Sequence, residues 1–298
     1  MHSYFVYGLN IESELELSQL RSSDQNPDVI FKLDTIENKP VLADNKSTAS
    51  WVTNDSACIT YKGIGTFLMR NGEEVIIDLL ETANVVEVSH ILLGVAISVI
   101  LHQRGYLVLH SSVIEMGDFS VGFVGHSGNG KSSIATMMLE KGYNLISDDL
   151  AVVGIDSSDQ YIVYSGYPQT KLWPDFVESI GINPDNLPLV NSDYTKRTRK
   201  INDYFTDKTT LPLKALYILD KGSEIEISDI KGHKCIFELV TYSYDIQLAK
   251  ATRELPKNLS QCTQLAKKVP VKRLQRPWEL KKMPDIVTAI EHDVLHSD

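Results

Sequence analysis

Short apolar runs separated by polar breaks dominate the first eighty or so residues of the chain. The runs are rich in β-branched and aromatic side chains, and the breaks contain glycine or polar residues, which is typical of half-buried β-strands. We expect strands at residues 4–7, 29–33, 57–61, 65–69 and 74–79. Residues 38–54 are polar and without a pattern, so we expect a loop there. Residues 1–84 are therefore predicted to form a β-rich N-terminal module, mainly antiparallel.

A longer apolar segment follows at residues 85–103, where apolar side chains cover nearly every face of a helix. Gly105 comes directly after it, at a position where glycine often ends helices. The most apolar part, residues 91–101, is shorter than the roughly 20 residues that a bilayer span requires. We therefore expect a buried helix and no membrane contact. The first residues lack a basic and then apolar stretch, so no secretory signal is expected.

Residues 107–155 alternate strands with one helix. Apolar runs at 107–115 and 120–124 flank a turn at 116–118, which predicts a hairpin. A helix is expected over 131–140, ended by Lys141 and Gly142, and a short strand over 143–147. Further strands are expected at 150–155, 161–165, 215–219 and 236–240, and a last helix at 283–295. The predicted fold class is α/β, with residues 85–298 forming one domain on a mixed sheet.

Charge and cysteine content narrow the range of partners. The net charge is −10, and residues 1–95 contain fourteen acidic and six basic side chains, which would repel nucleic-acid phosphates. We expect no nucleic-acid partner. Residues 256–282 differ, with eight basic side chains and one acidic one, and form either a solvated rim or a surface for an anionic partner. Three cysteines without a C-x-x-C pair are expected to be free thiols of a cytoplasmic protein.

A glycine-rich motif supplies the first candidate chemistry. Residues 125–132 match G-x-x-x-x-G-K-[ST] at every fixed position, between a predicted strand and a predicted helix. Such a loop points backbone N–H groups at an anion, beside the positive end of a helix dipole. Lys131 would contact the β- and γ-phosphates, and Ser132 would ligate Mg²⁺. The motif predicts a P-loop domain that binds a nucleoside triphosphate with Mg²⁺, and ATP is the nucleotide expected. The expected nucleotide-binding residues are Gly125, His126, Ser127, Gly128, Asn129, Gly130, Lys131, Ser132 and Ser133.

Two adjacent aspartates follow the strand after the predicted P-loop helix. Asp148 and Asp149 come 17 and 18 residues after Lys131. In a sheet wound this way the strand end lies beside the loop, so one carboxylate can serve the metal while the other accepts a proton from a hydroxyl. The spacing alone does not order these two roles. His110 lies within an apolar strand run, and is either a core histidine or the partner of a catalytic aspartate.

Residues 109–113, 121–133 and 142–149 together resemble the catalytic core of HPr serine kinase/phosphorylases, which is similar to that of phosphoenolpyruvate carboxykinase. Residues 7–9, 166–174, 211–213, 269–271 and 274–277 resemble the shorter HPr-kinase-like proteins of lasso-peptide biosynthetic operons. The resemblance implies His110, Lys131 and Asp148 as catalytic residues, with Asp148 as the general base and Asp149 beside the magnesium with Ser132. An Ile-Arg-Gly-Leu-Gly-like signature is missing, so HPr and the phosphorylase reaction are not expected.

Candidates for substrate binding lie further along the chain. Lys171 stands in a segment rich in proline and aromatic residues, and Lys196, Arg197, Arg199 and Lys200 form a basic run. Each is either an ordinary surface feature or a grip for an anion. Lys171, Lys196 and Arg197 are the expected substrate residues. The favoured hypothesis is an ATP-dependent kinase acting on a serine at or near the C-terminus of a short precursor peptide. A kinase of a free small metabolite and an NTP-binding regulatory switch stay open, as does a homo-oligomer.

Overall fold

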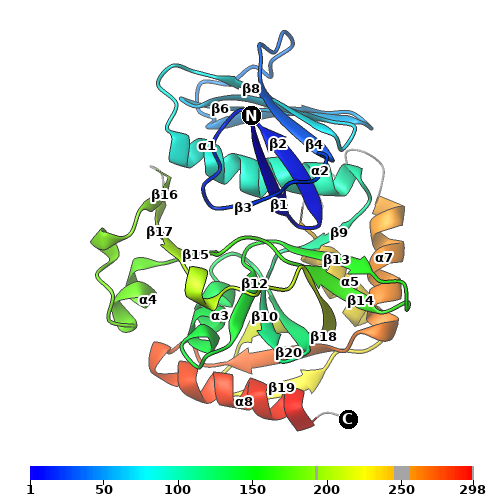
Figure 1. Ribbon diagram of the computed structural model, residues 1–298. Helices are drawn as coiled ribbons and strands as arrows, with labels where there is room; N and C mark the ends of the chain where they lie inside the picture. The colour runs from blue at the N-terminus through cyan, green and yellow to red at the C-terminus, as the bar shows by residue number, and fades with distance from the viewer. Residues whose placement is uncertain (192–193, 245–254, 297–298) are drawn as a thin grey trace. The chain divides into compact units, whose positions relative to one another are not determined.

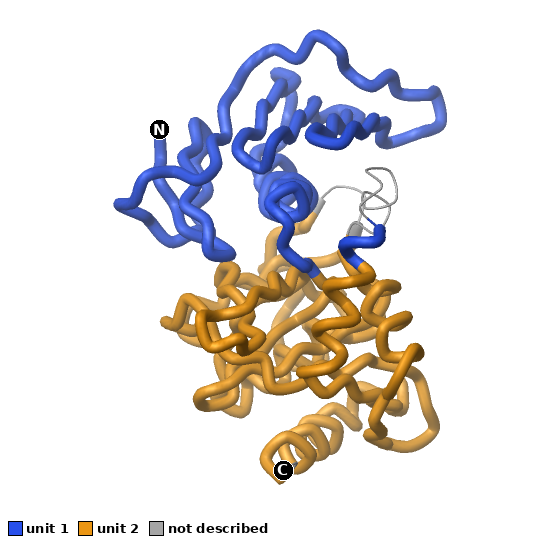
Figure 2. Tube along the Cα trace, turned by 90° about the vertical axis from the view of Figure 1, so that its right-hand side faces the viewer, with its two compact units in different colours: residues 1–108, 245–258 blue, residues 109–244, 259–298 orange. Residues whose placement is uncertain are grey.

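The computed structural model describes residues 1–191, 194–244 and 255–296, and it divides the chain into two compact units (Figures 1 and 2). The first unit comprises Met1–Val108 with Asp245–Asn258, blue in Figure 2, and the second comprises Leu109–Tyr244 with Leu259–Asp298, orange. The chain contains both strands and helices, and both large sheets contain parallel and antiparallel pairs. The α/β class with a mixed sheet is thus confirmed.

The first unit contains an eight-stranded sheet in the order β3-β1-β2-β4-β8-β7-β6-β5. Five of its strand pairs are antiparallel, and two, β2 with β4 and β4 with β8, are parallel. The bounds are β1 His2–Val6, β2 Leu9–Ser13, β3 Arg21–Ser22, β4 Val29–Leu33, β5 Thr48–Val52, β6 Ser56–Tyr61, β7 Gly65–Arg70 and β8 Glu74–Leu79. All five strands expected from the pattern are present within a residue or two.

The expected loop at residues 38–54 is wrong in its second half, which forms the edge strand β5. Trp51 packs against the buried side chains of Ile36, Cys58 and Ile76, and its indole Nε1 donates to the carbonyl of Asn38 at 2.9 Å. An edge strand that is half exposed needs few apolar residues, so its sequence carries no alternation to detect.

The apolar helical segment belongs to the first unit. It runs as α1 Val85–Ile91, a π-helical turn η1 Leu92–Ala96, and α2 Ile97–Gln103. These 19 residues are long and apolar enough to cross a bilayer by length and composition, and 67% of their most apolar window is buried inside the structure, as for a core helix. Gln103 ties α2 to the sheet, because its Nε2 donates to the carbonyl of Asp55 and its Oε1 accepts from the backbone N–H of Gly72. The boundary between the units therefore follows Val108, whereas the sequence placed it after Asn84.

The second unit is built on a sheet in the order β12-β10-β11-β18-β14-β13, with β20 beside β18 and β19 beside β20. A separate small sheet has the order β15-β17-β16. The bounds are β9 Leu107–Leu109, which spans the unit boundary, β10 Ser111–Met116, β11 Phe119–Val124, β12 Asn144–Ser147, β13 Ala151–Ile155, β14 Tyr161–Tyr164, β15 Gln169–Leu172, β16 Leu189–Asn191, β17 Tyr194–Lys200, β18 Thr210–Lys221, β19 Glu226–Asp229 and β20 Val271–Arg276. The helices are α3 Lys131–Leu139, α4 Pro174–Ser179, α5 His233–Thr241, α7 Leu255–Lys268, which spans the unit boundary, and α8 Met283–His296, with short 3₁₀ turns at Pro184–Asn186, Asn202–Tyr204 and Leu280–Lys282.

The strand expected at residues 236–240 is wrong, because this segment lies in helix α5. Cys235 and Leu239, four residues apart, are buried, while Phe237 between them is 77% exposed. The apolar residues of this segment follow the helical period, and an apolar run this short does not distinguish a strand from a helix.

One buried cluster fixes the site-bearing part of the second unit. Phe123 and Tyr217 of the sheet pack with Ile134 of α3 and Ile286 of α8 in this cluster. Asp293 of α8 also accepts hydrogen bonds from the hydroxyl of Tyr217 and the ammonium of Lys272, at 2.5 and 2.7 Å. Helices α3 and α8 are therefore held against the same strands that carry the candidate site.

Candidate functional site

Sheet topology brings the candidate residues to one edge. Strands β11 and β12 both run antiparallel to β10, so the ends of β11 and β12 meet the start of β10. The glycine loop continues from β11, Asp148 and Asp149 continue from β12, and His110 directly precedes β10. Strands β18 and β20 are parallel to β11, so Arg276, at the end of β20, comes to the same edge. Ligands commonly bind at the carboxyl ends of parallel strands.

The glycine loop turns tightly into α3, which begins at Lys131. Gly128 and Gly130 have φ angles of +87° and +80°, a left-handed conformation that favours glycine. A Cβ on Gly130 would also collide with the guanidinium of Arg276. The ammonium of Lys131 donates to the carbonyls of Gly125 and His126, at 2.8 and 3.1 Å. Backbone, helix start and lysine thus have the arrangement that an anion-binding loop requires.

Lys131 is only 6% exposed, and this burial controls its charge. Burial lowers the pKa of Lys131 to about 8, against the opposing attraction of Asp148 and Asp149. A buried ammonium in this state gains from a bound anion, which would stabilise the charged form. The electrostatics therefore match the phosphate contact expected for this lysine.

Asp148 is fixed against the loop. Its Oδ1 accepts hydrogen bonds from the hydroxyls of Ser112 and Ser132, at 2.5 and 2.9 Å, and its Oδ2 accepts from the backbone N–H of Lys171 at 3.1 Å. Among the described residues no three His, Cys, Asp or Glu side chains form a metal cluster. Mg²⁺ is commonly held by one or two protein oxygens, with phosphates and waters as its other ligands. The Ser132 hydroxyl and the Asp148 carboxylate, side by side, fit that requirement.

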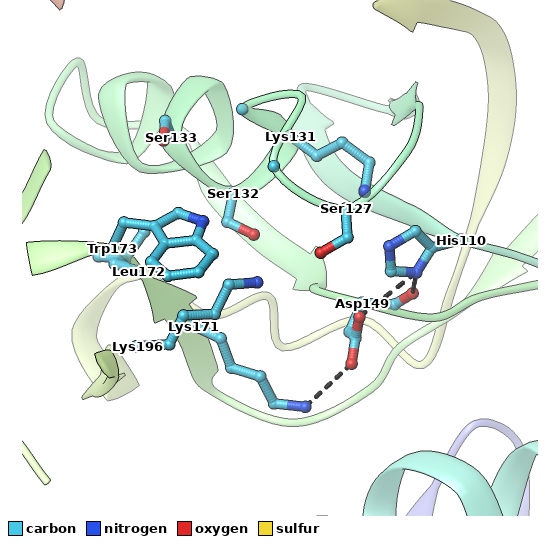
Figure 3. A pocket seen from close by; sticks show the side chains of 12 residues that line it. His110, Ser127, Lys131, Ser132, Ser133, Asp149, Lys171, Leu172, Trp173 and Lys196 are labelled. Carbon is cyan, nitrogen blue, oxygen red and sulfur yellow. Dashed lines mark hydrogen bonds and ion pairs between the residues drawn. The ribbon is translucent and has the colours of Figure 1, made fainter. Parts of the chain in front are cut away.

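Asp149 faces a different set of partners, although it is the next residue. Its φ of +79° places it in the left-handed region. One carboxylate oxygen accepts from the ammonium of Lys171 at 2.9 Å, and the other lies 3.4 Å from His110 Nδ1 (Figure 3). Burial would raise the pKa of Asp149, but the attraction of Lys171 and then His110 outweighs it and holds the pKa well below its usual range. Asp149 is therefore an ionised carboxylate in the pocket.

His110 is the third member of this group. Its Nδ1 lies 3.1 Å from the carbonyl oxygen of Asp149, and its backbone N–H donates to the carbonyl of Tyr242. Burial, and then the charge of Lys131, lowers the pKa of His110, so the imidazole is neutral at neutral pH. The histidine that the resemblance pairs with a catalytic aspartate thus contacts Asp149.

The pocket combines the glycine loop with the small sheet of the second unit (Figure 3). Lys171 and Trp173 enter from β15 and the residue after it, and Lys196 enters from β17, with its ammonium 5.1 Å from the centre of the Trp173 ring. The lining residues are His110, Ser127, Gly128, Gly130, Lys131, Ser132, Ser133, Asp149, Lys171, Leu172, Trp173 and Lys196. Of the sequence-expected residues, Asp148 lies behind this lining, hydrogen-bonded to Ser132.

The two arginines of the basic run pair with carboxylates of this chain. Arg197 pairs with Asp185 at 3.1 Å, and Arg199 pairs with Glu140 at 3.0 Å. The expected substrate residue Arg197 is thus engaged in an ion pair outside the pocket lining, whereas Lys196 and Lys171 line the pocket.

Most basic side chains of the segment 256–282 are also neutralised by ion pairs with carboxylates of this chain. Its ion pairs join Lys268 to Asp159, Lys272 to Asp293, Arg273 to Asp220, Lys281 to Glu279 and Lys282 to Asp285. These pairs favour the solvated-rim interpretation of this segment. The three cysteines are all free and buried.

Two site residues were missed by the sequence analysis. Ser112 holds Asp148, and its position two residues after His110 could have indicated it, since alternate residues of an extended chain share a face. Arg276 reaches the loop, where its Nη2 donates to the carbonyl of Asn129 at 2.7 Å. No local pattern indicates Arg276, because its place depends on the pairing of β20 with β18.

Comparison with known proteins does not assign this chain to a family. No family model matches the chain, and no curated protein sequence matches it. Among solved structures, the chain is similar to the Hpr(Ser) kinase/phosphatase from Coxiella burnetii, with a TM-score of 0.36 and 11% identity, over 63% of this chain and 96% of that one. Functional conclusions therefore depend on the geometry of the site.

Proposed function

We propose that the second unit is a Mg²⁺- and ATP-dependent kinase that transfers the γ-phosphoryl group to a hydroxyl. The observation that carries this proposal is the separation of two neighbouring carboxylates. Asp148 is bound to the serine of the glycine loop, while Asp149 lies in the pocket with His110 and Lys171. A protein that only binds or hydrolyses a nucleotide needs the first carboxylate, and a kinase also needs a base for its acceptor.

Each part of the site has a task in this reaction. The loop N–H groups and Lys131 bind the triphosphate, and Ser132 and Asp148 would hold Mg²⁺, which supplies charge neutralisation when bound. Asp149 accepts the proton of the acceptor hydroxyl, whose oxygen bonds to the γ-phosphorus as the bond to the β–γ bridging oxygen breaks and ADP leaves. Lys171 keeps Asp149 ionised, and neutral His110 orients it.

This assignment exchanges the roles that the family resemblance implies, in which Asp148 is the base and Asp149 is beside the metal. Both oxygens of Asp148 already accept hydrogen bonds, one of them from Ser132. Asp149 belongs to the pocket lining, where an acceptor would lie. The geometry therefore favours Asp149 as the base.

For the acceptor we propose a serine at or near the C-terminus of a short precursor peptide. Lys171 and Lys196 place positive charge in the pocket beside the proposed base, which suits a carboxylate close to the reacting hydroxyl. The resemblance to kinases of lasso-peptide operons favours the same acceptor. A small hydroxy acid has the same two groups, so the test must include one.

The function is tested by incubating the protein with Mg-ATP and three acceptors. These are a short peptide ending in serine, the same peptide with an amidated C-terminus, and a small hydroxy acid. Mass spectrometry should find a phosphate on the serine of the free-acid peptide, and much less on the amidated one. Phosphorylation of the hydroxy acid alone would identify a metabolite kinase. ADP formation that no acceptor accelerates would contradict the kinase proposal and favour a switch.

The two aspartates are separated by their amide variants. Asp149→Asn should retain Mg-ATP affinity and lose transfer by about 10²–10⁴-fold, the usual contribution of a general base. Asp148→Asn should weaken ATP binding in the presence of Mg²⁺ and affect Mg²⁺-free binding much less. Calorimetric titrations with and without Mg²⁺, beside rate measurements, distinguish the two. The opposite pattern would restore the roles that the resemblance implies.

A further inference from the structure

A second pocket adjoins the glycine loop. Gly128, Gly130 and Ser133 line it together with Phe176, Trp278 and Met283. Trp173 borders both pockets. In Figure 3, Ser133 and Trp173 lie on the side away from His110 and Asp149. Ser133 and Trp173, which the second pocket shares with the first, therefore lie on the side of the first pocket away from the proposed base.

Arg276 supports this pocket from behind. It is 2% exposed, its Nη2 donates to the carbonyl of Asn129, and its Nε has no hydrogen-bond partner. Within the described part of the chain it forms no ion pair with a carboxylate. Burying a guanidinium without a carboxylate partner costs free energy, so we expect Arg276 to have a functional role. Its position links the loop carbonyl to the ring of Trp278, which lies 4.8 Å from its central carbon.

The walls of the second pocket suit a flat, neutral group. Trp278 is 47% exposed and Trp173 is 39% exposed, whereas Phe176 and Met283 are buried beneath. A large exposed ring backed by a buried cation offers a stacking face for an aromatic ligand. These rings adjoin the phosphate cradle without a break, because three loop and helix residues belong to both linings.

Charge separates the two pockets. The first is lined by the ammonium groups of Lys131, Lys171 and Lys196 and by one carboxylate, that of Asp149. The second is lined by the carboxylates of Asp175 and Glu279 and by one cation, Arg276, so the balance of charge is positive in the first pocket and negative in the second. A nucleoside triphosphate has the matching asymmetry, with an anionic tail and an uncharged base and sugar that donate hydrogen bonds. Only one orientation places the tail by the lysines and the donors by the carboxylates.

We propose that the second pocket is the nucleoside subsite, in which Trp278 stacks on the base and Arg276 positions both Trp278 and the loop. This inference rests on the proposed function only in taking the ligand to be a nucleoside triphosphate. Because stacking serves every base, the subsite contributes affinity and little discrimination among nucleotides.

The test compares Mg-ATP with Mg-tripolyphosphate, which has the tail without the nucleoside, by calorimetric titration of the full chain. Wild type should bind ATP more tightly than tripolyphosphate. Trp278→Ala should weaken ATP binding by about tenfold or more, the loss expected for one stacked base, and leave tripolyphosphate affinity unchanged. Trp278→Phe should recover most of the loss. Phe237→Ala, which removes an exposed ring on α5 of the same unit, is the matched control and should change neither affinity.

The outcomes keep this inference apart from the kinase proposal. Equal affinity of wild type for the two ligands, or an equal loss of both in Trp278→Ala with Trp278→Phe no better, would overturn the nucleoside subsite and leave the phosphate cradle intact. ATP binding that depends on Trp278, with no acceptor phosphorylated, would support the subsite and contradict the kinase. Failure of both ligands to bind would overturn both.

Discussion

The two units differ in where they bury charge. In the first unit, the described buried polar residues such as Ser13, Thr66 and Ser98 are uncharged, and ion pairs such as Lys32–Glu74 are partly exposed. In the second unit, Lys131, Asp148 and Arg276 are buried at one edge of the sheet. Burying charge costs free energy that folding does not recover in full. This difference supports the proposal that the second unit buries charge in order to bind a ligand, whereas the first unit buries only uncharged polar side chains among its described residues.

Removing the lysine of the loop should have the largest effect. Lys131→Ala should lower transfer by about 10²–10³-fold, because one preorganised charge on the transferring phosphoryl group is lost. The thermal stability of Lys131→Ala should not be lower than that of wild type at pH 7. Burial disfavours the charged form of Lys131 in the folded chain and lowers its pKa to about 8, so removing the ammonium relieves that cost. Between that value and the unfolded pKa of 10.5 the unfolded chain binds more protons, so this group makes wild type gain stability as the pH rises.

Rate assays and denaturant unfolding at pH 7 and pH 10 check both parts of this prediction. The gain in stability with pH should be smaller in Lys131→Ala than in wild type. Near-normal transfer by the variant would contradict the phosphate contact, and a large loss of stability at pH 7 would make Lys131 a structural residue like those of the first unit.

The next largest effect should be on stability, and it compares one ion pair of the second unit with one of the first. Lys171→Met should destabilise the second unit by about 3 kcal/mol, since it strands the Asp149 carboxylate in a confined pocket. Lys32→Met, which breaks a more exposed pair of the first unit, should cost about 0–1 kcal/mol. Denaturant unfolding of the two variants measures the difference. Equal losses would remove the contrast between the units.

The smallest expected effect is at His110. In the acidic range His110 is protonated, and its positive charge then contributes, after that of Lys171, to the low pKa of Asp149, so His110→Ala should raise that pKa. The base must be ionised to act, and therefore the acidic limb of the kcat/KM profile should move to higher pH. A shift of one unit reduces the rate on that limb by about tenfold. A variant that loses stability but keeps the wild-type pH profile would place His110 among purely structural histidines.

Sequence alone was most informative where local rules decide the structure. The short apolar, β-branched runs of β4 and β8 and the fixed spacing from Gly125 to Ser132 could be interpreted without the rest of the chain. The edge strand β5 could not, because its residues have no pattern and packing decides its state. Helix α5 was missed because its apolar run is too short to distinguish a helix from a strand, although its apolar residues follow the helical period.

The same distinction applies to the candidate site. Asp148 and Asp149 were found as a pair, but their separate surroundings depend on His110 and Ser112 at the start of β10 and on Lys171 of β15, which come from two other segments. The contact of Arg276 with the loop requires three parallel strands to assemble in order, and no spacing along the chain encodes that.

The left-handed backbone at Asp149 limits which amino acids can replace it. Glycine and asparagine adopt that conformation easily but bring no negative charge to Lys171. Glutamate brings the charge but is longer, and it lacks the short side chain that makes this conformation tolerable for aspartate. The position requires both a left-handed backbone and a negative charge. Each amino acid that resembles aspartate meets one of these two requirements and not the other. Random variation at this position should therefore find no working substitute in a single step, and a second site would have to change with it.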